Sequence, residues 1–177
     1  MVDKFMEFVQ EQSSAAQDAS NSELSVEAEV TRWLDHLNTL GKFVDDSLKP
    51  YAESGIKTTK RMVRITEEPT GEYEVPQFEI SVGSALVRLK PIGTFLIGAF
   101  GRVDMEGPRG VCRFILVPSK AQTPLFAFNA PDAEQMAKDK PWADLVWKIM
   151  PAPPSRSYID LSSEVFRDFF IKVVRGV

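Results

Sequence analysis

Hydrophobic residues recur every three or four positions between residues 26 and 48, with polar residues between them. The recurring residues are Val26, Val30, Trp33, Leu34, Leu37, Leu40, Val44 and Leu48. This spacing places them on one side of an α-helix. Ser22 and Ser25 are the candidate N-cap residues, and Pro50 and Gly55 mark the end of the helix. The pattern predicts a long amphipathic helix that packs on a core.

Residues 59 to 119 contain short apolar or alternating runs that are separated by turn residues. The runs are 59–66, 76–83, 84–93, 94–103 and 110–119. Alternation with a period of two is typical of half-buried strands. None of the intervening stretches is long enough for the crossover helix that a parallel sheet needs. The runs therefore predict a mainly antiparallel sheet of about five strands.

The stretch GAFGRVDMEGPRGVCR, residues 98 to 113, combines four glycines with three arginines and two acidic residues. A phosphate-binding loop of this kind needs Lys-Ser or Lys-Thr after its last glycine and then a helix. Here an apolar strand follows instead. We interpret the stretch as a β-hairpin with its turn in residues 104–110, and Gly98 and Gly101 as a bulge or a bend.

The last third of the chain predicts helices. Residues 131–140 form a short polar candidate, and residues 141–150 place apolar side chains on one helical face after Pro141. The C-terminal helix begins at Ser162 or Ser163 and ends near Arg175. Its apolar face consists of Val165, Phe166, Phe169, Phe170, Val173 and Val174. The predicted fold class is α+β: a long N-terminal helix, the sheet, and C-terminal helices packed on the sheet.

Residues 10 to 23, QEQSSAAQDASNSE, are small and polar, and they predict a flexible linker or a frayed helix end. Four apolar residues precede them: Phe5, Met6, Phe8 and Val9. A short isolated helix is marginally stable in water, so this group must dock either on the chain's own core or on a partner. We place an amphipathic arm and linker at 1–22 and a single α+β domain at 23–177.

The composition excludes several classes of protein. The 177 residues carry a net charge of -4 and one cysteine, which permits no intramolecular disulfide and suits a reducing compartment. No apolar run reaches the roughly 18 residues of a membrane span. The N-terminal residues lack the basic start of a secretory signal. We expect a cytoplasmic protein that does not enter a membrane.

Catalytic side chains are scarce, because His36 and Cys112 are the only histidine and the only cysteine. We interpret His36 as a boundary residue of the helix and Cys112 as an inert buried thiol, and we predict no cofactor and no metal. One alternative is a metal-dependent hydrolase or nuclease that uses Glu79 and Asp104. That chemistry needs an acid-x-lysine on the strand after Asp104, and the sequence has none there.

A second alternative is nucleic-acid binding through a basic sheet face formed by Lys60, Arg61, Arg64 and Arg88. Basic residues on edge strands also discourage aggregation between sheets. The interpretation that we favour is a non-catalytic protein that binds a macromolecule, most simply another protein or a second copy of itself, as an adaptor, an inhibitor or a complex subunit. Its predicted contact residues are Phe5, Met6, Phe8 and Val9.

Overall fold

The computed structural model describes residues 4–68, 70–94, 99–123, 144–152, 155 and 157–176, and for residues 4–25 it describes the backbone alone. Its centre is one antiparallel sheet in which every strand pairs with its neighbour in sequence. The strands are β1 (Ile56–Glu67), β2 (Gly71–Val82), β3 (Ala85–Gly93), β4 (Gly101–Gly107), β5 (Gly110–Pro118), β6 (Leu145–Met150) and β7 (Ile159–Asp160). The predicted α+β class is confirmed, with seven strands in the described chain in place of about five.

The long helix α1 spans Lys4–Leu48 and is followed by the 3-10 helix η1, Lys49–Ser54. Gly55 ends η1 with a φ of 91°, a conformation that glycine adopts without strain. The helix predicted over residues 26–48 is confirmed. However, α1 also continues through residues 10–23, where the sequence predicted a linker or a frayed helix end, so Ser22 and Ser25 lie inside the helix and are not N-caps.

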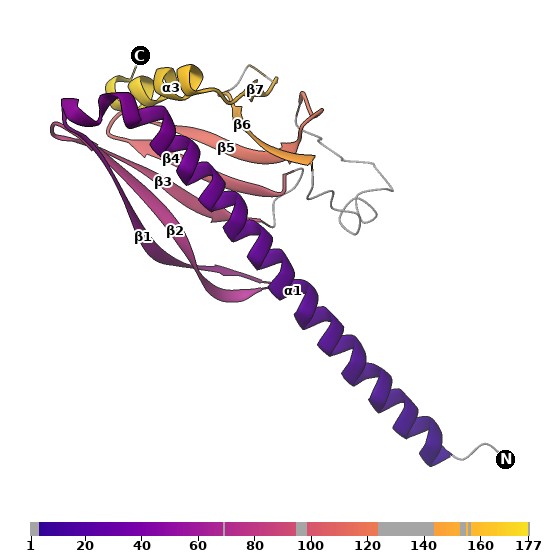
Figure 1. Cartoon of the computed structure of the whole chain (residues 1–177). Helices are drawn as coiled ribbons and strands as arrows, with labels where there is room; N and C mark the ends of the chain where they lie inside the picture. Colours follow the sequence, from indigo (N-terminus) through magenta and orange to yellow (C-terminus); the bar gives the residue numbers. More distant parts are fainter. Residues whose placement is uncertain are drawn as a thin grey trace.

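One face of the sheet carries the hydrophobic core, and α1 covers it. Trp33, Leu37, Leu40 and Val44 are at most 1% exposed and belong to a cluster with the buried side chains of β2 to β6. Gly101 lets the helix approach β4 closely, because a Cβ atom at this position would overlap the ring of Trp33. In Figure 1, α1 runs obliquely across the sheet and then extends well beyond it toward the N-terminus.

The C-terminal helix α3, Ser163–Arg175, packs on the same face. Every second residue of a strand lies on the same face of the sheet, so Gly101 and Gly107 of β4 share a face. Gly101 lies against Trp33 of α1, and Gly107 lies against Val173 of α3. The Ser162 hydroxyl accepts a hydrogen bond from the Val165 amide at 3.2 Å, which makes Ser162 the N-cap. This helix and its cap agree with the sequence prediction.

The glycine-rich stretch is a β-hairpin, as predicted for its described part, residues 99–113. The turn is shorter than expected, because Asp104 and Glu106 belong to β4 and only Pro108 and Arg109 lie between the strands. The Arg109 amide donates to the Val173 carbonyl at 2.9 Å, which ties the turn to α3. Gly98 lies outside the described residues.

The helix predicted over residues 141–150 is wrong, because Leu145–Met150 forms strand β6. Leu145, Trp147 and Ile149 alternate toward the core, and β6 pairs with β5 along its length. A helical spacing and a strand spacing both fit this short run, and the open edge of β5 decides between them. The helix predicted at 131–140 lies outside the described residues.

The close approach of α1 to β4 can be tested by adding one methyl group. Gly101→Ala should lower the free energy of unfolding by about 1 to 3 kcal/mol, because the new Cβ overlaps the Trp33 ring and the helix or the strand must shift. Gly110→Ala is the matched control on the neighbouring strand, where the nearest atom is 3.7 Å from the new Cβ. Urea unfolding of both variants measures the difference, and equal losses would contradict the close packing.

Candidate functional site

The residues that we predicted from the sequence to contact a partner lie at the N-terminal end of α1. Phe5, Met6, Phe8 and Val9 fall within the helical backbone of Lys4–Leu48, and their side chains lie outside the described part of the structure. At a rise of 1.5 Å per residue, Phe5 is about 42 Å from Trp33 along the helix axis. Figure 1 shows no other labelled element beside this end of α1.

The other half of α1 is fixed firmly to the sheet. The indole N–H of Trp147 donates to the carbonyl of His36 at 3.0 Å, and the Lys60 ammonium donates to Asn38 Oδ1 at 2.9 Å. Near the end of the helix, the Arg167 guanidinium of α3 donates to the carbonyl of Ser47 at 3.2 Å. Together with the buried apolar residues of α1, these hydrogen bonds fix the direction of the helix axis. They therefore also fix the direction of its projecting N-terminal half.

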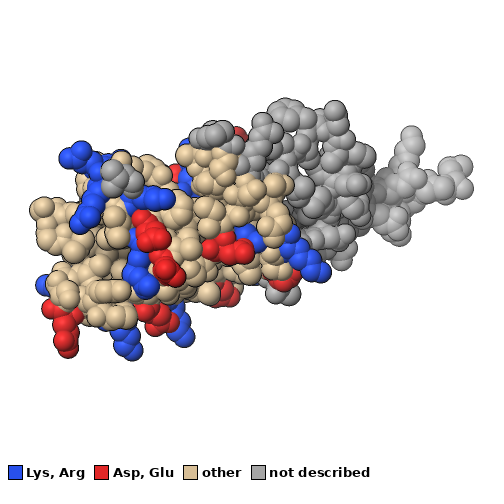
Figure 2. All heavy atoms as spheres, turned by 90° about the horizontal axis from the view of Figure 1, so that it is seen from above, with Lys and Arg blue, Asp and Glu red and all other residues tan. Residues whose placement is uncertain are grey.

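The outer face of the sheet, turned away from α1 and α3, carries charges that alternate across the strands. Glu79 lies between Arg61 at 3.6 Å and Arg88 at 3.2 Å. Between β3 and β4, Lys90 contacts Glu106 diagonally across the pair of strands at 3.9 Å. Most of these groups are half exposed, so each pair contributes little to stability. Figure 2, seen from the side on which α3 lies in Figure 1, shows basic and acidic side chains interspersed over the described surface there as well.

The structure does not gather the four predicted nucleic-acid residues on one face. Lys60 reaches α1, whereas its neighbour Arg61 points to the outer face beside Glu79. Arg64 contacts two other acids of β2, Glu72 at 3.2 Å and Glu74 at 3.8 Å. Arg88 shares Glu79 with Arg61. Neighbouring carboxylates therefore offset the positive potential that phosphate binding would use.

The two acids of the hydrolase alternative also lie apart. Glu79 is on β2 and Asp104 is on β4, with β3 between them. Glu79 pairs with Arg88 and Asp104 pairs with Lys90, so the two acids are also offset by two residues along the strands. At about 4.8 Å per strand and 3.3 Å per residue they are roughly 12 Å apart. Asp104 is held by Arg102 through two hydrogen bonds of 2.7 and 2.6 Å. Among the described residues, no group of three or more histidine, cysteine or acidic side chains has a geometry that could hold a metal ion.

The single histidine and the single cysteine lie where the sequence predicted. His36 is half-buried on α1, and burial lowers its pKa while Asp35 opposes that shift. Cys112 is 5% exposed within the core, and burial, aided by the charge of Asp104, raises the pKa of its thiol to about 12. Thiolate formation is therefore suppressed at neutral pH, and the thiol is poorly suited to nucleophilic chemistry.

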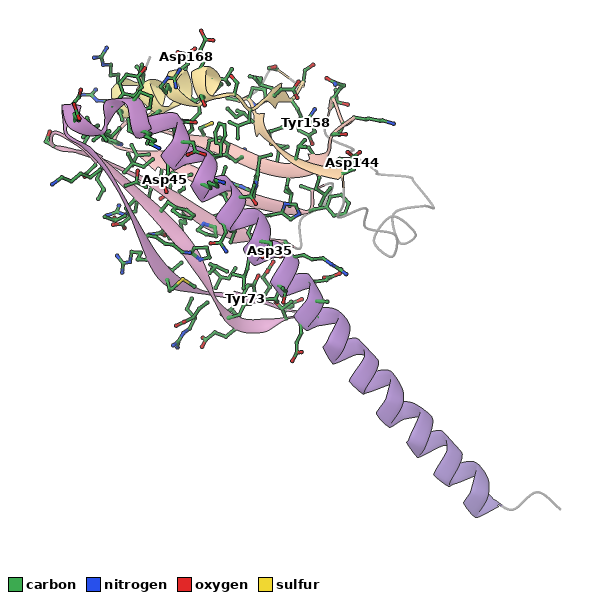
Figure 3. The ribbon with its side chains drawn as sticks, viewed as in Figure 1. Asp35, Asp45, Tyr73, Asp144, Tyr158 and Asp168 are labelled. Carbon is green, nitrogen blue, oxygen red and sulfur yellow. The ribbon has the colours of Figure 1, made fainter. Side chains whose placement is uncertain are left out.

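A polar network at the tip of the β1–β2 hairpin was not apparent from the sequence. The Glu67 carboxylate accepts hydrogen bonds from the Tyr73 hydroxyl and from the Thr94 amide, the latter at 2.6 Å. Burial, followed by the bond to Glu67, raises the pKa of Tyr73. Tyr73, labelled in Figure 3, lies where this hairpin approaches α1. The network ties the hairpin tip to the end of β3. Its bond from Thr94 to Glu67 joins residues that are 27 positions apart in the sequence.

A buried ammonium group on β6 was also missed. Lys148 is 2% exposed, and its Nζ lies 2.8 Å from Asp160 of β7, which is its register partner. Beside it a small second cluster of Ile115, Val117 and Tyr158 covers the outer face at this end of the sheet. Within a run that had been interpreted as helix, a lysine between apolar residues gave no signal of this pairing.

A depression of about 280 Å³ lies between the end of α1, η1 and the start of β1, with Asp45, Asp46 and Lys49 in its lining. Among the helices that the structure describes, none is both long enough and apolar enough to span a membrane.

No protein family model, no curated protein and no solved structure matches the chain.

The chemistry of Cys112 gives a test of the core around it. Because the folded-state pKa is raised from 9.0 to about 12, the protonated thiol favours folding at pH values below about 9, and this contribution is lost as pH rises toward 12. A thiol reagent at about pH 8 should modify the unfolded chain rapidly and the folded chain only as fast as it opens. Rapid modification of the folded protein would contradict the burial.

Proposed function

We propose that this chain is a non-catalytic binding protein that docks to another protein through the projecting N-terminal half of α1. The single observation that carries the proposal is the position of that half: a helix with Phe5, Met6, Phe8 and Val9 at its end extends beyond the sheet, with no labelled element beside it (Figure 1). The sheet and α3 serve as the scaffold that fixes the direction of the helix.

The physical argument starts from the stability of the projecting half. Helices in water owe most of their stability to packing of an apolar face, and residues 13–22 are rich in serine and other weak helix formers. Burying side chains of the Phe, Met and Val type is worth about 1.5 to 3 kcal/mol each. A partner that covers this half of α1 would supply that stabilisation.

The continuity of α1 favours a partner outside the chain's own domain. The half of α1 whose side chains the structure describes is fixed on the sheet by Trp33 and its neighbours. A helix that continues straight from there carries Phe5 about 42 Å away from Trp33. Residues so placed are out of reach of the core that Trp33 belongs to, which supports docking on a second molecule.

The rest of the described surface supports binding in preference to catalysis. Glu79 and Asp104 interact with arginines of their own sheet and do not converge on one cleft. Cys112 and His36 lie on different elements, in the core and on α1 respectively. We therefore retain protein binding as the proposed function, with Phe5, Met6, Phe8 and Val9 as the contact residues.

The test removes the apolar end of α1 without touching the domain. Phe5→Ser with Phe8→Ser should leave the thermal midpoint nearly unchanged, because these residues lie beyond the sheet, and should abolish self-association or capture of a partner. Gln10→Ser with Gln17→Ser is the matched control, since it adds two serines to the same helix and removes no large apolar side chain. Calorimetry and light scattering provide the two measurements.

Two results would contradict the proposal. If the midpoint fell by many degrees while association was unchanged, Phe5 and Phe8 would be core residues of their own domain. If the control pair and the phenylalanine pair behaved alike in association, the apolar side chains would not be the contact residues.

A further inference from the structure

The apolar stripe by which α1 packs on the sheet continues, in register, along its projecting half. Four residues of this stripe, Trp33, Leu37, Leu40 and Val44, are fully buried and are spaced alternately by four and three residues. Continuing this alternation toward the N-terminus reaches Val30, Val26, Glu23, Ala19, Ala16, Gln12, Val9 and Phe5. Six of these eight residues are apolar, and the alternation is the heptad pattern of a helix that packs along another helix.

The order of residues along this stripe is self-complementary when two copies run in opposite directions. With a two-fold axis level with the bond between Gln17 and Asp18, Phe5 of one copy is level with Val30 of the other, and Val9 with Val26. Ala16 is then level with Ala19, and Gln12 with Glu23. Apolar residues meet apolar residues in three of these layers. The fourth layer pairs an amide with a carboxylate, which can form a hydrogen bond.

A parallel arrangement of the same two helices is less favourable. It would place Glu23 level with Glu23 of the second copy, and like charges across a helix seam are destabilising. The antiparallel arrangement removes this repulsion. The other acids of the projecting half, Glu7, Glu11 and Asp18, do not fall on the stripe, so their helical positions leave them at the solvent side of such a pair.

The two domains also fit at opposite ends of the paired helices. Val26 and Val30, the layers nearest the sheet, are part-buried and not fully covered by their own domain. In the antiparallel pair, the end of the second helix reaches these residues and extends one residue further, to Lys4 level with Thr31. The two Trp33 residues would then be about 46 Å apart along the axis, which keeps the sheets clear of each other.

We infer that the occupant of the projecting half of α1 is a second copy of this chain, and that residues 5 to 30 of the two copies form an antiparallel helical pair. This inference rests on the proposed function and names its partner. The interface is isologous, so it closes as a two-fold dimer and does not propagate into filaments.

The first test is the mass of the full chain in solution. Light scattering between about 1 and 100 µM should report twice the monomer mass of 19.8 kDa at the upper end, with dissociation on dilution. A monomer over this whole range would overturn the inference. It would leave the proposed function to its own test, the capture of a different protein by the wild-type chain and not by the Phe5→Ser, Phe8→Ser variant.

The second test uses the polar layer to determine the direction of pairing. Gln12→Lys places a lysine level with Glu23 of the second copy in both symmetry-related layers, whereas Gln12→Glu places two carboxylates there. The dimer dissociation constant of Gln12→Lys should be at least about tenfold lower than that of Gln12→Glu. Gln10→Lys and Gln10→Glu, which change charge by the same amount at a position off the stripe, are the matched controls and should differ by much less.

The outcomes of this comparison separate the arrangements. In a parallel pair, Gln12→Lys and Gln12→Glu would both place like charges opposite each other, so equal weakening would overturn the antiparallel dimer. A difference at position 12 no larger than that at position 10 would also overturn it. As a rescue, Gln12→Glu combined with Glu23→Lys should restore the affinity of Gln12→Lys, because each glutamate is again level with a lysine.

Discussion

The packing of α1 on the sheet determines the rest of the architecture. Two glycines let the helix lie this close: a Cβ at Gly41 of α1 would overlap the ring of Phe78, and one at Gly101 of β4 would overlap the ring of Trp33. The large rings therefore fill the space that the missing side chains leave. Because these contacts fix the direction of the helix axis, they also fix the direction in which the N-terminal half leaves the domain.

The charges of the chain are arranged so that the sheet neutralises itself. Glu79 with its two arginines, the Arg102–Asp104 pair and the Lys90–Glu106 pair place opposite signs side by side on the outer face. Such pairs add little stability, but each places a carboxylate beside a basic side chain, which weakens the positive potential that a polyanion would use. The acids of α1 have a different distribution: residues 1–30 contain seven acidic residues and one lysine. On our account all of these acids except Glu23 lie off the apolar stripe, where they keep the paired helices soluble.

The elements that could be predicted from the sequence are those with a long or unambiguous period. The helix from Val26 to Leu48 has six turns of consistent spacing, and α3 has both its Ser162 cap and its Gly176 end. The β2–β3 hairpin alternates clearly. In each case local preference and tertiary burial agree, which makes the local pattern sufficient.

Other elements depend on neighbours that the local sequence does not contain. Strand β6 is six residues long, and only the open edge of β5 and the pairing of Lys148 with Asp160 make it a strand. The short strand β7 has no local signal at all. At the candidate site, the apolar group at Phe5 was visible in the sequence. The helical continuity of residues 10–23 was not, because the serine, asparagine and aspartate residues of this stretch are weak helix formers and favour a linker.

The continuity of α1 is the central claim, and a distance along the helix tests it most directly. Spin labels at Glu7→Cys and Lys42→Cys, in a Cys112→Ala background diluted with unlabelled chain, report the separation of two positions on one α1. The account predicts a narrow distribution near 52 Å, which is 35 residues at the helical rise. A broad distribution centred well below that value, as a flexible linker of about 14 residues would give, would contradict the account.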